Sequence, residues 1–249
     1  MSMKGKVYLV GAGPGDPGLF TIKGLELLRS ADVVMYDALA NPELLAECKE
    51  GAELIDAGKR ARDHHLSQWQ TNELLVKYAE EGKTVVRLKG GDPFLFGRGA
   101  EEAEELRAAG AEVHVVPGVS SSISVPELAG IPVTHRDYAS MVTFITGHEK
   151  DGRGEDRVDW RALVKGHGTL VIMMGLGNAG RISRELIEGG MSPDTPAAVI
   201  SKGSTPEQRV EVTTVAGLEA TIRDKALEPP GIMVVGEVAL VRERLGDLA

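Results

Sequence analysis

The chain has 249 residues, of which 42% are hydrophobic and 26% are charged, and its formal net charge is −9. This length gives one large domain or two small ones, and the negative charge excludes bulk attraction to nucleic acid or to an anionic membrane. The single cysteine, Cys48, excludes an internal disulfide and a multi-cysteine metal site. No window has the length of a membrane span, and the N-terminal apolar run is too short for a signal peptide, so we expect a soluble cytoplasmic protein.

The first half of the chain alternates between predicted strands and predicted helices. Short apolar runs predict strands at residues 7–10, 32–36, 54–55, 85–88 and 113–116. Helical spacing and capping residues predict helices at 21–30, 41–48, 67–81 and 98–109, with a further helix start at Ser120. Ser67 and Gln70 have the spacing of a capping box. Regular alternation of this kind favours a mainly parallel sheet.

The second half has a mixed pattern. Strands are expected at 141–145, 170–174, 197–200, 208–212 and 232–235, and helices at 178–188 and 216–225. Residues 208–212 alternate between polar and apolar side chains, which is typical of an exposed antiparallel strand. Gly130 to Thr134 has the composition of a linker. We therefore predict two α/β domains, an N-terminal one at residues 1–134 and a C-terminal one at 138–249.

The stretch from Val85 to Gly99, VVRLKGGDPFLFGRG, is the most informative in the chain. It begins as a buried strand and continues as a loop. Gly90 and Gly91 remove Cβ atoms where the strand ends, so that a ligand can reach the backbone. Asp92 supplies an acceptor and Pro93 fixes the turn.

The pattern G-D-P-x-L-F of this loop has one echo, from Gly15 to Phe20, after the first strand. Alone, the earlier loop is equally consistent with a tight turn and with a ligand-binding site. Two such loops at strand ends indicate a crevice of the kind where open α/β sheets bind ligands. Asp16 occupies the third glycine of the dinucleotide pattern G-x-G-x-x-G, and neither loop has a positive charge among its glycines. A neutral or cationic ligand therefore suits the crevice better than a phosphate.

Several charged residues are candidates for chemistry beside this crevice. Asp37 ends the second strand, where it is equally consistent with a general base and with a helix cap. Glutamates cluster from Glu101 to Glu105, and we expect this run to be a solvated helix face. Glu101 is the exception, because it follows Arg98 by three residues and shares its helix face. The basic segment from Lys59 to His65 is either an anion-binding loop or a solvated one. Its two histidines have no second pair, so we expect no metal.

Taken together, several segments resemble the uroporphyrinogen-III C-methyltransferases of the tetrapyrrole methylase family, in their monofunctional form. The segments, spread from residue 6 to about 236, include VGAGPGDPGLFT, YDAL, GKR, RLKGGDPFLFGRGAEE, VPGVSS, GIPVTHRDYAS and TGHEK. The resemblance implies the class III methyltransferase fold, in which two α/β domains hold S-adenosyl-L-methionine in the cleft between them, and a homodimer. It also implies methylation of uroporphyrinogen III at C2 and C7, through precorrin-1 to precorrin-2, with S-adenosyl-L-homocysteine as the other product. This reaction belongs to siroheme and cobalamin biosynthesis.

The same resemblance implies roles for individual residues. Asp37 matches the proton acceptor and Lys59 the proton donor, while Arg98, Glu101 and Arg136 match positions for substrate binding or proton abstraction. Either Asp37 or Glu101 can therefore be the base. The cofactor contacts fall on Pro14, Gly90, Gly91, Asp92, Leu95, Ser120, Ser121, Met174 and Gly203.

Three other classes of protein compete with this interpretation. The first is a methylase of the same family that acts on a later precorrin or on a modified protein histidine; Arg98 with Glu101, and the residues from His135 to Tyr138, favour uroporphyrinogen. The second is a nicotinamide oxidoreductase, against which Asp16 argues. The third is a sensor that binds the cofactor without turnover, which has no need of Asp37 and the basic segment.

Overall fold

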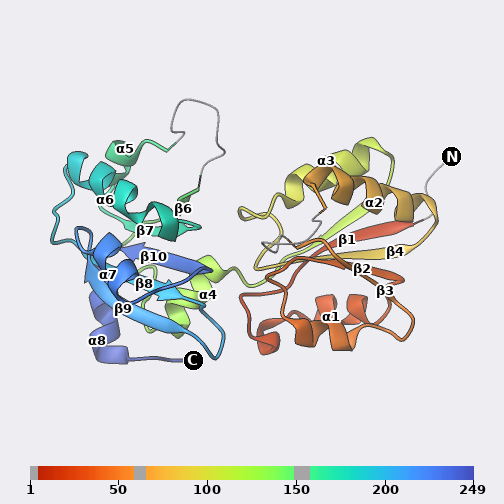
Figure 1. Cartoon of the computed structure of the whole chain (residues 1–249), viewed down its shortest axis with the longest axis horizontal. Helices are drawn as coiled ribbons and strands as arrows, with labels where there is room; N and C mark the ends of the chain where they lie inside the picture. Colours follow the sequence, from red (N-terminus) through yellow and green to blue (C-terminus); the bar gives the residue numbers. More distant parts are fainter. Residues whose placement is uncertain (1–4, 59–65, 149–157) are drawn as a thin grey trace. The chain divides into compact units, whose positions relative to one another are not determined.

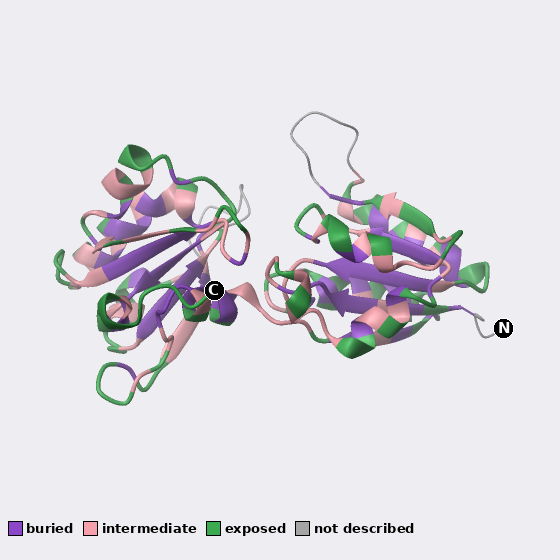
Figure 2. Cartoon of the chain, turned by 90° about the horizontal axis from the view of Figure 1, so that it is seen from below, coloured by how far each residue is buried: buried purple, intermediate pink, exposed green. Residues whose placement is uncertain are grey.

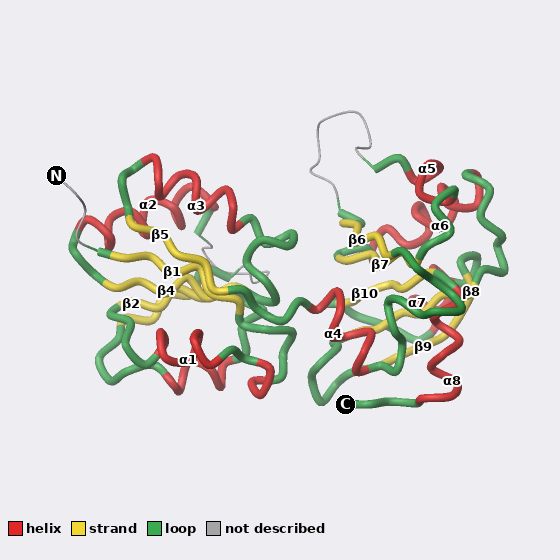
Figure 3. Tube along the Cα trace, turned by 180° about the vertical axis from the view of Figure 1, so that it is seen from behind, coloured by secondary structure: helices red, strands yellow, loops and turns green. Residues whose placement is uncertain are grey.

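The computed structural model of the chain describes residues 5–58, 66–148 and 158–249. The chain divides into two compact units, residues 1–120 and 121–249 (Figure 1). Each unit has its own five-stranded sheet, with helices on both faces of the strands (Figure 3). The predicted pair of α/β domains is therefore confirmed as a fold class. Over the described ranges, no helix has the length and apolarity needed to cross a membrane.

The sheet of the first unit is entirely parallel, as predicted, with the strand order β3-β2-β4-β1-β5. Its strands are β1 (Lys6–Gly11), β2 (Val33–Tyr36), β3 (Glu53–Asp56), β4 (Thr84–Lys89) and β5 (Glu112–Val116). Its helices are η1 (Pro17–Leu19), α1 (Ile22–Leu28), η2 (Pro42–Glu47), α2 (Gln68–Glu80) and α3 (Gly99–Ala108). The capping box of α2 is present, since the Ser67 and Gln70 side chains both bond to backbone N–H groups.

The two faces of this sheet are buried by different helices because alternate side chains of a strand point to opposite sides. Val85 packs with Leu75 of α2 and Leu106 of α3. Its neighbour Val86 packs with Leu28 of α1 and other residues on the opposite face. Figure 1 shows α2 and α3 on one side of the strands and α1 on the other, and Figure 2 shows the strands as the buried centre of the unit. A parallel sheet covered on both faces is the usual arrangement for βαβ units.

All five strands end at one edge of the sheet because they run parallel. The turns after β1 and β4 contact each other directly at this edge. Gly13 donates an N–H to the Gly91 carbonyl at 3.2 Å, and Gly91 donates to the Gly13 carbonyl at 2.8 Å. Gly13 has φ +79° and Gly91 has φ +65°, a conformation that side chains other than glycine rarely adopt. The two loops that the sequence placed on one crevice are therefore neighbours.

The turn after β5 reaches the same edge. A Cβ on Gly118 would lie 2.7 Å from the Gly11 Cα and closer still to the Gly91 carbonyl oxygen. Three backbone segments thus pass one another with no room for a side chain, and this contact fixes the loops relative to the sheet.

The sheet of the second unit is mixed, as predicted, with the order β6-β7-β10-β8-β9. Among the described strands of this unit, only β6 and β7 pair in parallel, and β9 pairs antiparallel with β8 at the edge. The strands are β6 (Val142–Thr146), β7 (Thr169–Met173), β8 (Pro196–Ser201), β9 (Arg209–Thr214) and β10 (Gly231–Val235). The helices are α4 (Ser121–Leu128), α5 (Trp160–Val164), η3 (Leu176–Asn178), α6 (Ala179–Glu188), α7 (Leu218–Asp224), η4 (Glu237–Val241) and α8 (Arg242–Leu245). Of these, α5, η3, η4 and α8 were not predicted.

The boundary between the units lies at Ser120, earlier in the chain than the linker that the sequence indicated. The segment from α4 to Ile131 belongs to the second unit because its apolar side chains are in that core. Val125, Ala129 and Ile131 are buried against side chains of β7, β8 and β10. Composition alone placed Gly130 and Ile131 in a linker, but Ile131 is fully buried. Packing therefore moves the boundary by more than ten residues relative to residue 134.

We predict that Gly118→Ala destabilises the protein by about 1–3 kcal/mol, because the added Cβ overlaps backbone atoms that cannot move aside. Gly177→Ala is the matched control, since a Cβ on Gly177 meets nothing within 4 Å. The control is expected within about 0.5 kcal/mol of the parent. Urea unfolding followed by circular dichroism measures both, and equal stabilities for the two variants would refute the backbone contact.

Candidate functional site

Asp92 holds the loop that follows β4. Its Oδ1 accepts from the N–H groups of Phe94 and Leu95, at 2.9 and 3.2 Å. Its Oδ2 accepts from the Gly118 N–H at 3.2 Å, and so the carboxylate also ties this loop to the turn after β5. In the earlier loop, the Asp16 Oδ1 accepts from the Gly18 N–H at 2.7 Å. The sequence echo is thus a shared turn in which the aspartate binds backbone N–H groups.

The cofactor residues predicted in the first unit lie at the carboxyl edge of its sheet. Pro14 follows β1, Gly90 follows β4, and Ser120 ends the segment after β5. Leu95, in the loop held by Asp92, is half-buried. A Cβ on Gly90 would lie 2.8 Å from the Cβ of Leu39, so a side chain there would displace the loop after β2. The glycines keep the backbone of these loops close together.

The cofactor residues predicted in the second unit also gather at one edge. Strands β7 and β8 both pair antiparallel with β10, so they run in the same direction and end on the same side. Met174 follows β7, and Gly203 follows β8 after Lys202, whose N–H bonds to the Pro230 carbonyl at 2.7 Å. A Cβ on Gly203 would lie 3.0 Å from the Val125 Cβ of α4, the helix that Ser121 begins.

Backbone strain concentrates in these loops. Met174, Lys202 and Ser204 have φ values of 54°, 50° and 62°, and in the first unit Phe96 and Arg98 have 54° and 61°. Only a few per cent of non-glycine residues adopt positive φ, and such residues gather at functional sites. Five of the seven such positions among the described residues therefore lie in the loops that the sequence selected, whereas the other two, His167 before β7 and Ala226 after α7, do not.

Asp37 is an ion-pair partner rather than a helix cap. The cap of η2 is Asn41, whose Oδ1 accepts from the Glu43 N–H at 2.8 Å. The Asp37 Oδ1 accepts from Nη2 of Arg87 at 2.5 Å, and its Oδ2 lies 3.9 Å from Nζ of Lys89. The Asp37 side chain is 29% exposed, so the two cations of β4 hold its carboxylate while part of the side chain remains open to solvent.

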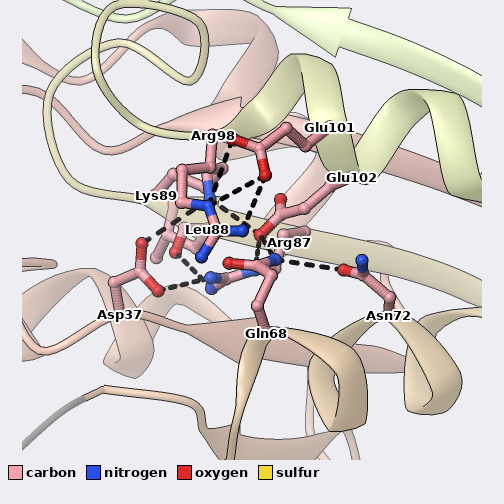
Figure 4. A network of polar contacts seen from close by, with 9 residues as sticks. All are labelled: Asp37, Gln68, Asn72, Arg87, Leu88, Lys89, Arg98, Glu101 and Glu102. Atoms are coloured by element: carbon pink, nitrogen blue, oxygen red, sulfur yellow. Dashed lines mark hydrogen bonds and ion pairs between the residues drawn. The ribbon is translucent and has the colours of Figure 1, made fainter. Parts of the chain in front are cut away.

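Glu102 completes a buried network with the same two cations (Figure 4). Its Oε1 accepts from Nζ of Lys89 at 2.9 Å and from Nε of Arg87 at 3.4 Å. Gln68 of α2 donates to the same oxygen at 3.0 Å. The side chains of Arg87, Lys89 and Glu102 are 5%, 3% and 0% exposed. Charges are buried at this depth only when they are paired and hydrogen-bonded.

The local sequence pattern did not predict this network. The expectation that the glutamates after Glu101 form a solvated face is wrong for Glu102, and Arg87 and Lys89 stand unmarked inside an otherwise apolar run. A signal was present, because a strand buried on both faces should be a continuous apolar run. Two cations spaced by two residues, near the end of the central strand, mark one face of it as a polar site.

Burial lowers the pKa of Lys89, and the nearby Arg87 charge lowers it further. The carboxylates of Glu102 and Asp37 act in the opposite direction and favour the ammonium form. The charge of Lys89 therefore depends on these two anions.

The remaining predicted residues are on the surface or outside the described residues. Arg98 binds Glu101 through Nη2 at 2.6 Å, and both side chains are about half exposed. This pair confirms that the two side chains meet, although Arg98 is the N-cap residue before α3 and not a member of its helical face. Arg136 is exposed in a turn closed by bonds between His135 and Ala139. Lys59 and the basic segment to His65 lie outside the described residues.

The comparisons with known proteins agree with the resemblance in sequence. Residues 6–219 match the model of the family described as Tetrapyrrole (Corrin/Porphyrin) Methylases. The chain is 51% identical to the S-adenosyl-L-methionine-dependent uroporphyrinogen III methyltransferase of Methanosarcina barkeri, over 98% of this chain and 95% of that protein.

Two solved structures are similar over nearly their whole length. One is uroporphyrin-III C-methyltransferase from Thermus thermophilus in complex with S-adenosyl homocysteine, which has a TM-score of 0.79 at 36% sequence identity. The match covers 95% of this chain and 94% of the Thermus chain. A cobalt precorrin-4 methyltransferase of cobalamin biosynthesis has a TM-score of 0.83 at 31% identity, with 94% and 95% coverage.

We predict that Asp92→Asn destabilises the protein by about 1–3 kcal/mol, because one end of the carboxamide cannot accept and a backbone N–H loses its partner. Asp16→Asn is the matched control in the equivalent turn, where the amide oxygen can still accept from Gly18. Its expected loss is about 0.5 kcal/mol or less. Urea unfolding compares them, and an equal loss in both would contradict the bridging role of Asp92.

Proposed function

Because the chain belongs to the tetrapyrrole (corrin/porphyrin) methylase family, we propose that it is an S-adenosyl-L-methionine-dependent uroporphyrinogen III methyltransferase. It methylates C2 and C7 of the macrocycle and gives precorrin-2 through precorrin-1. The product serves siroheme and cobalamin biosynthesis.

The observation that carries the proposal is the 51% identity to the Methanosarcina barkeri enzyme over nearly the full length of both chains. The fold alone does not select the substrate, since the precorrin-4 methyltransferase has the higher TM-score at the lower sequence identity. A nicotinamide oxidoreductase is disfavoured by membership of the family and by Asp16, whose carboxylate occupies the turn where the dinucleotide pattern needs glycine.

We propose that the residues at the two sheet edges bind the cofactor. The first edge offers backbone groups of closely packed glycine turns, and the second offers the half-exposed Met174 side chain. Open backbone and apolar side chains suit a ligand with a flat base, a ribose and a zwitterionic amino acid. When bound, S-adenosyl-L-methionine supplies an electrophilic methyl group. The proposed contacts are Pro14, Gly90, Gly91, Asp92, Leu95, Ser120, Ser121, Met174 and Gly203.

The carboxylates of the chain supply the proton chemistry in this proposal. Methylation of a pyrrole carbon must be followed by removal of a proton from the macrocycle, and general-base assistance is typically worth about 10²–10⁴-fold. Asp37 and Glu101 are the two candidates for the base, and both carboxylates reach solvent while an arginine holds them. Lys59 is the proposed proton donor.

Cations of the chain bind the substrate in this proposal. Uroporphyrinogen III carries eight carboxylates, and a chain with net charge −9 must gather positive charge locally to attract it. Arg98 and Arg136 present exposed guanidinium groups, which match carboxylates as two-pronged donors. Arg98 is already paired with Glu101, so a substrate carboxylate competes with Glu101 for it.

We also propose a cytoplasmic homodimer. A porphyrinogen is readily oxidised, and so its methylation suits a reducing compartment. The resemblance to the family implies the dimer, which light scattering of the purified protein measures directly.

The proposed function is tested by an anaerobic assay with uroporphyrinogen III and radiolabelled S-adenosyl-L-methionine. We expect two labelled methyl groups in the extracted tetrapyrrole and a precorrin-2 spectrum. Cofactor binding without transfer to uroporphyrinogen would refute the substrate and direct the assay to later precorrins, and then to a protein acceptor.

We predict that the variant of the true base, Asp37→Asn or Glu101→Gln, lowers kcat by about 10²-fold or more. Its affinity for S-adenosyl-L-homocysteine, measured by calorimetry, should stay within about twofold of the parent value, because the base acts on the macrocycle. Glu104→Gln is the control, since Glu104 is exposed on the same helix as Glu101. Equal losses of turnover and cofactor affinity would contradict the role of a base.

A further inference from the structure

Glu102 is the centre of the buried network at the carboxyl end of β4. One of its oxygens accepts from three donors, which come from two secondary-structure elements: Gln68 of α2, and Arg87 and Lys89 of β4. Its other oxygen, Oε2, is buried without a hydrogen-bond partner among the described residues. The carboxylate does not itself contact Asp37, but both cations that it binds do (Figure 4).

We propose that Glu102 is a positioning residue: its buried carboxylate holds Arg87 and Lys89 so that their free N–H groups face Asp37. This inference rests on the proposed function, since it assigns a purpose to the environment of a candidate base.

The geometry divides the donors of each cation between the two carboxylates. Arg87 gives its Nε to Glu102 and its Nη2 to Asp37. Lys89 gives its Nζ to Glu102 at 2.9 Å and lies 3.9 Å from Asp37. A guanidinium fixed at Nε can present its terminal nitrogens in only one plane. Glu102 thereby determines where Arg87 reaches Asp37.

Charge balance is a second argument that Glu102 positions the two cations. The network holds two cations and two carboxylates, and Glu102 is the only one of the four with a fully buried side chain. Without its negative charge, two neighbouring cations would share the single carboxylate of Asp37. Asp37 would then be held more tightly and Lys89 would be less favourable as an ammonium.

The charge of Lys89 reports on this arrangement. Among the described residues, the charged groups that face Lys89 are Arg87 on its own strand, Glu102 on α3 and Asp37 after β2. Removing the Glu102 charge removes one of the two anions that favour the ammonium form. Since a lysine loses its charge as the pH rises through its pKa, Lys89 should become neutral at a lower pH in such a variant.

The experiment uses Glu102→Gln in the full chain, because a glutamine keeps the shape and an acceptor oxygen while losing the charge. Glu104→Gln, on the exposed face of α3, is the control. We expect Glu102→Gln to lower kcat about tenfold, less than the loss of a base itself. The S-adenosyl-L-homocysteine affinity should stay unchanged. An unchanged kcat, or parallel losses of kcat and cofactor affinity, would overturn the positioning role.

A nuclear magnetic resonance titration of Lys89 separates this inference from the proposed function, because it needs no substrate. The Lys89 resonance should titrate at a lower pH in Glu102→Gln than in Glu104→Gln, whichever tetrapyrrole the enzyme methylates, and identical titrations would refute the coupling. If Glu102→Gln does not fold, the double variant Lys89→Met with Glu102→Gln keeps the network neutral, because Arg87 and Asp37 are its remaining charged groups, but it lacks the Glu102 charge that holds Arg87 in place. That variant should fold and show a reduced kcat, whereas parental turnover would overturn the proposal.

Discussion

The burial of charge on the central strand of the first sheet is the constraint on which the proposed active site depends. Arg87 and Lys89 lie in a strand covered by helices on both faces, where an unpaired charge costs several kcal/mol. This cost is offset because Glu102 pairs with both cations and because Asp37 follows β2, the neighbouring strand of the sheet. The same pairing that makes the core possible therefore fixes a carboxylate at the edge of the sheet. Structure and proposed chemistry share one set of ion pairs.

Close packing of the backbone also fixes the loops at this edge of the sheet. The turns after β1, β4 and β5 approach so closely that Gly118 cannot carry a Cβ, and Asp92 ties two of them together through backbone N–H groups. Rigid loops on a rigid sheet hold a ligand with little loss of conformational freedom on binding. Orientation of this kind matters for methyl transfer, because holding two reactants in line can supply roughly 7–11 kcal/mol of the barrier.

In the second unit, two strands of a mixed sheet also end at one edge. Its strands β7 and β8 point the same way only because β10 runs between them in the opposite direction. Left-handed backbone at Met174, Lys202 and Ser204 turns the chain sharply at the ends of these strands. Residues with this strain persist where the surrounding packing determines them, as Val125 of α4 does for the loop at Gly203.

The sequence by itself determined the fold class, the strands of both sheets, the two glycine loops and the family, since these follow from local periodicity, turn residues and motifs. It also indicated that Arg98 and Glu101 lie close together, a relation that their spacing of three residues predicts. It did not reveal that Ile131 belongs to a core or that Glu102 is buried beside Arg87 and Lys89. Burial depends on which elements cover a residue, and α3 meets β4 only in the folded unit. Tertiary structure alone therefore decided which carboxylates are solvated and which are held by cations.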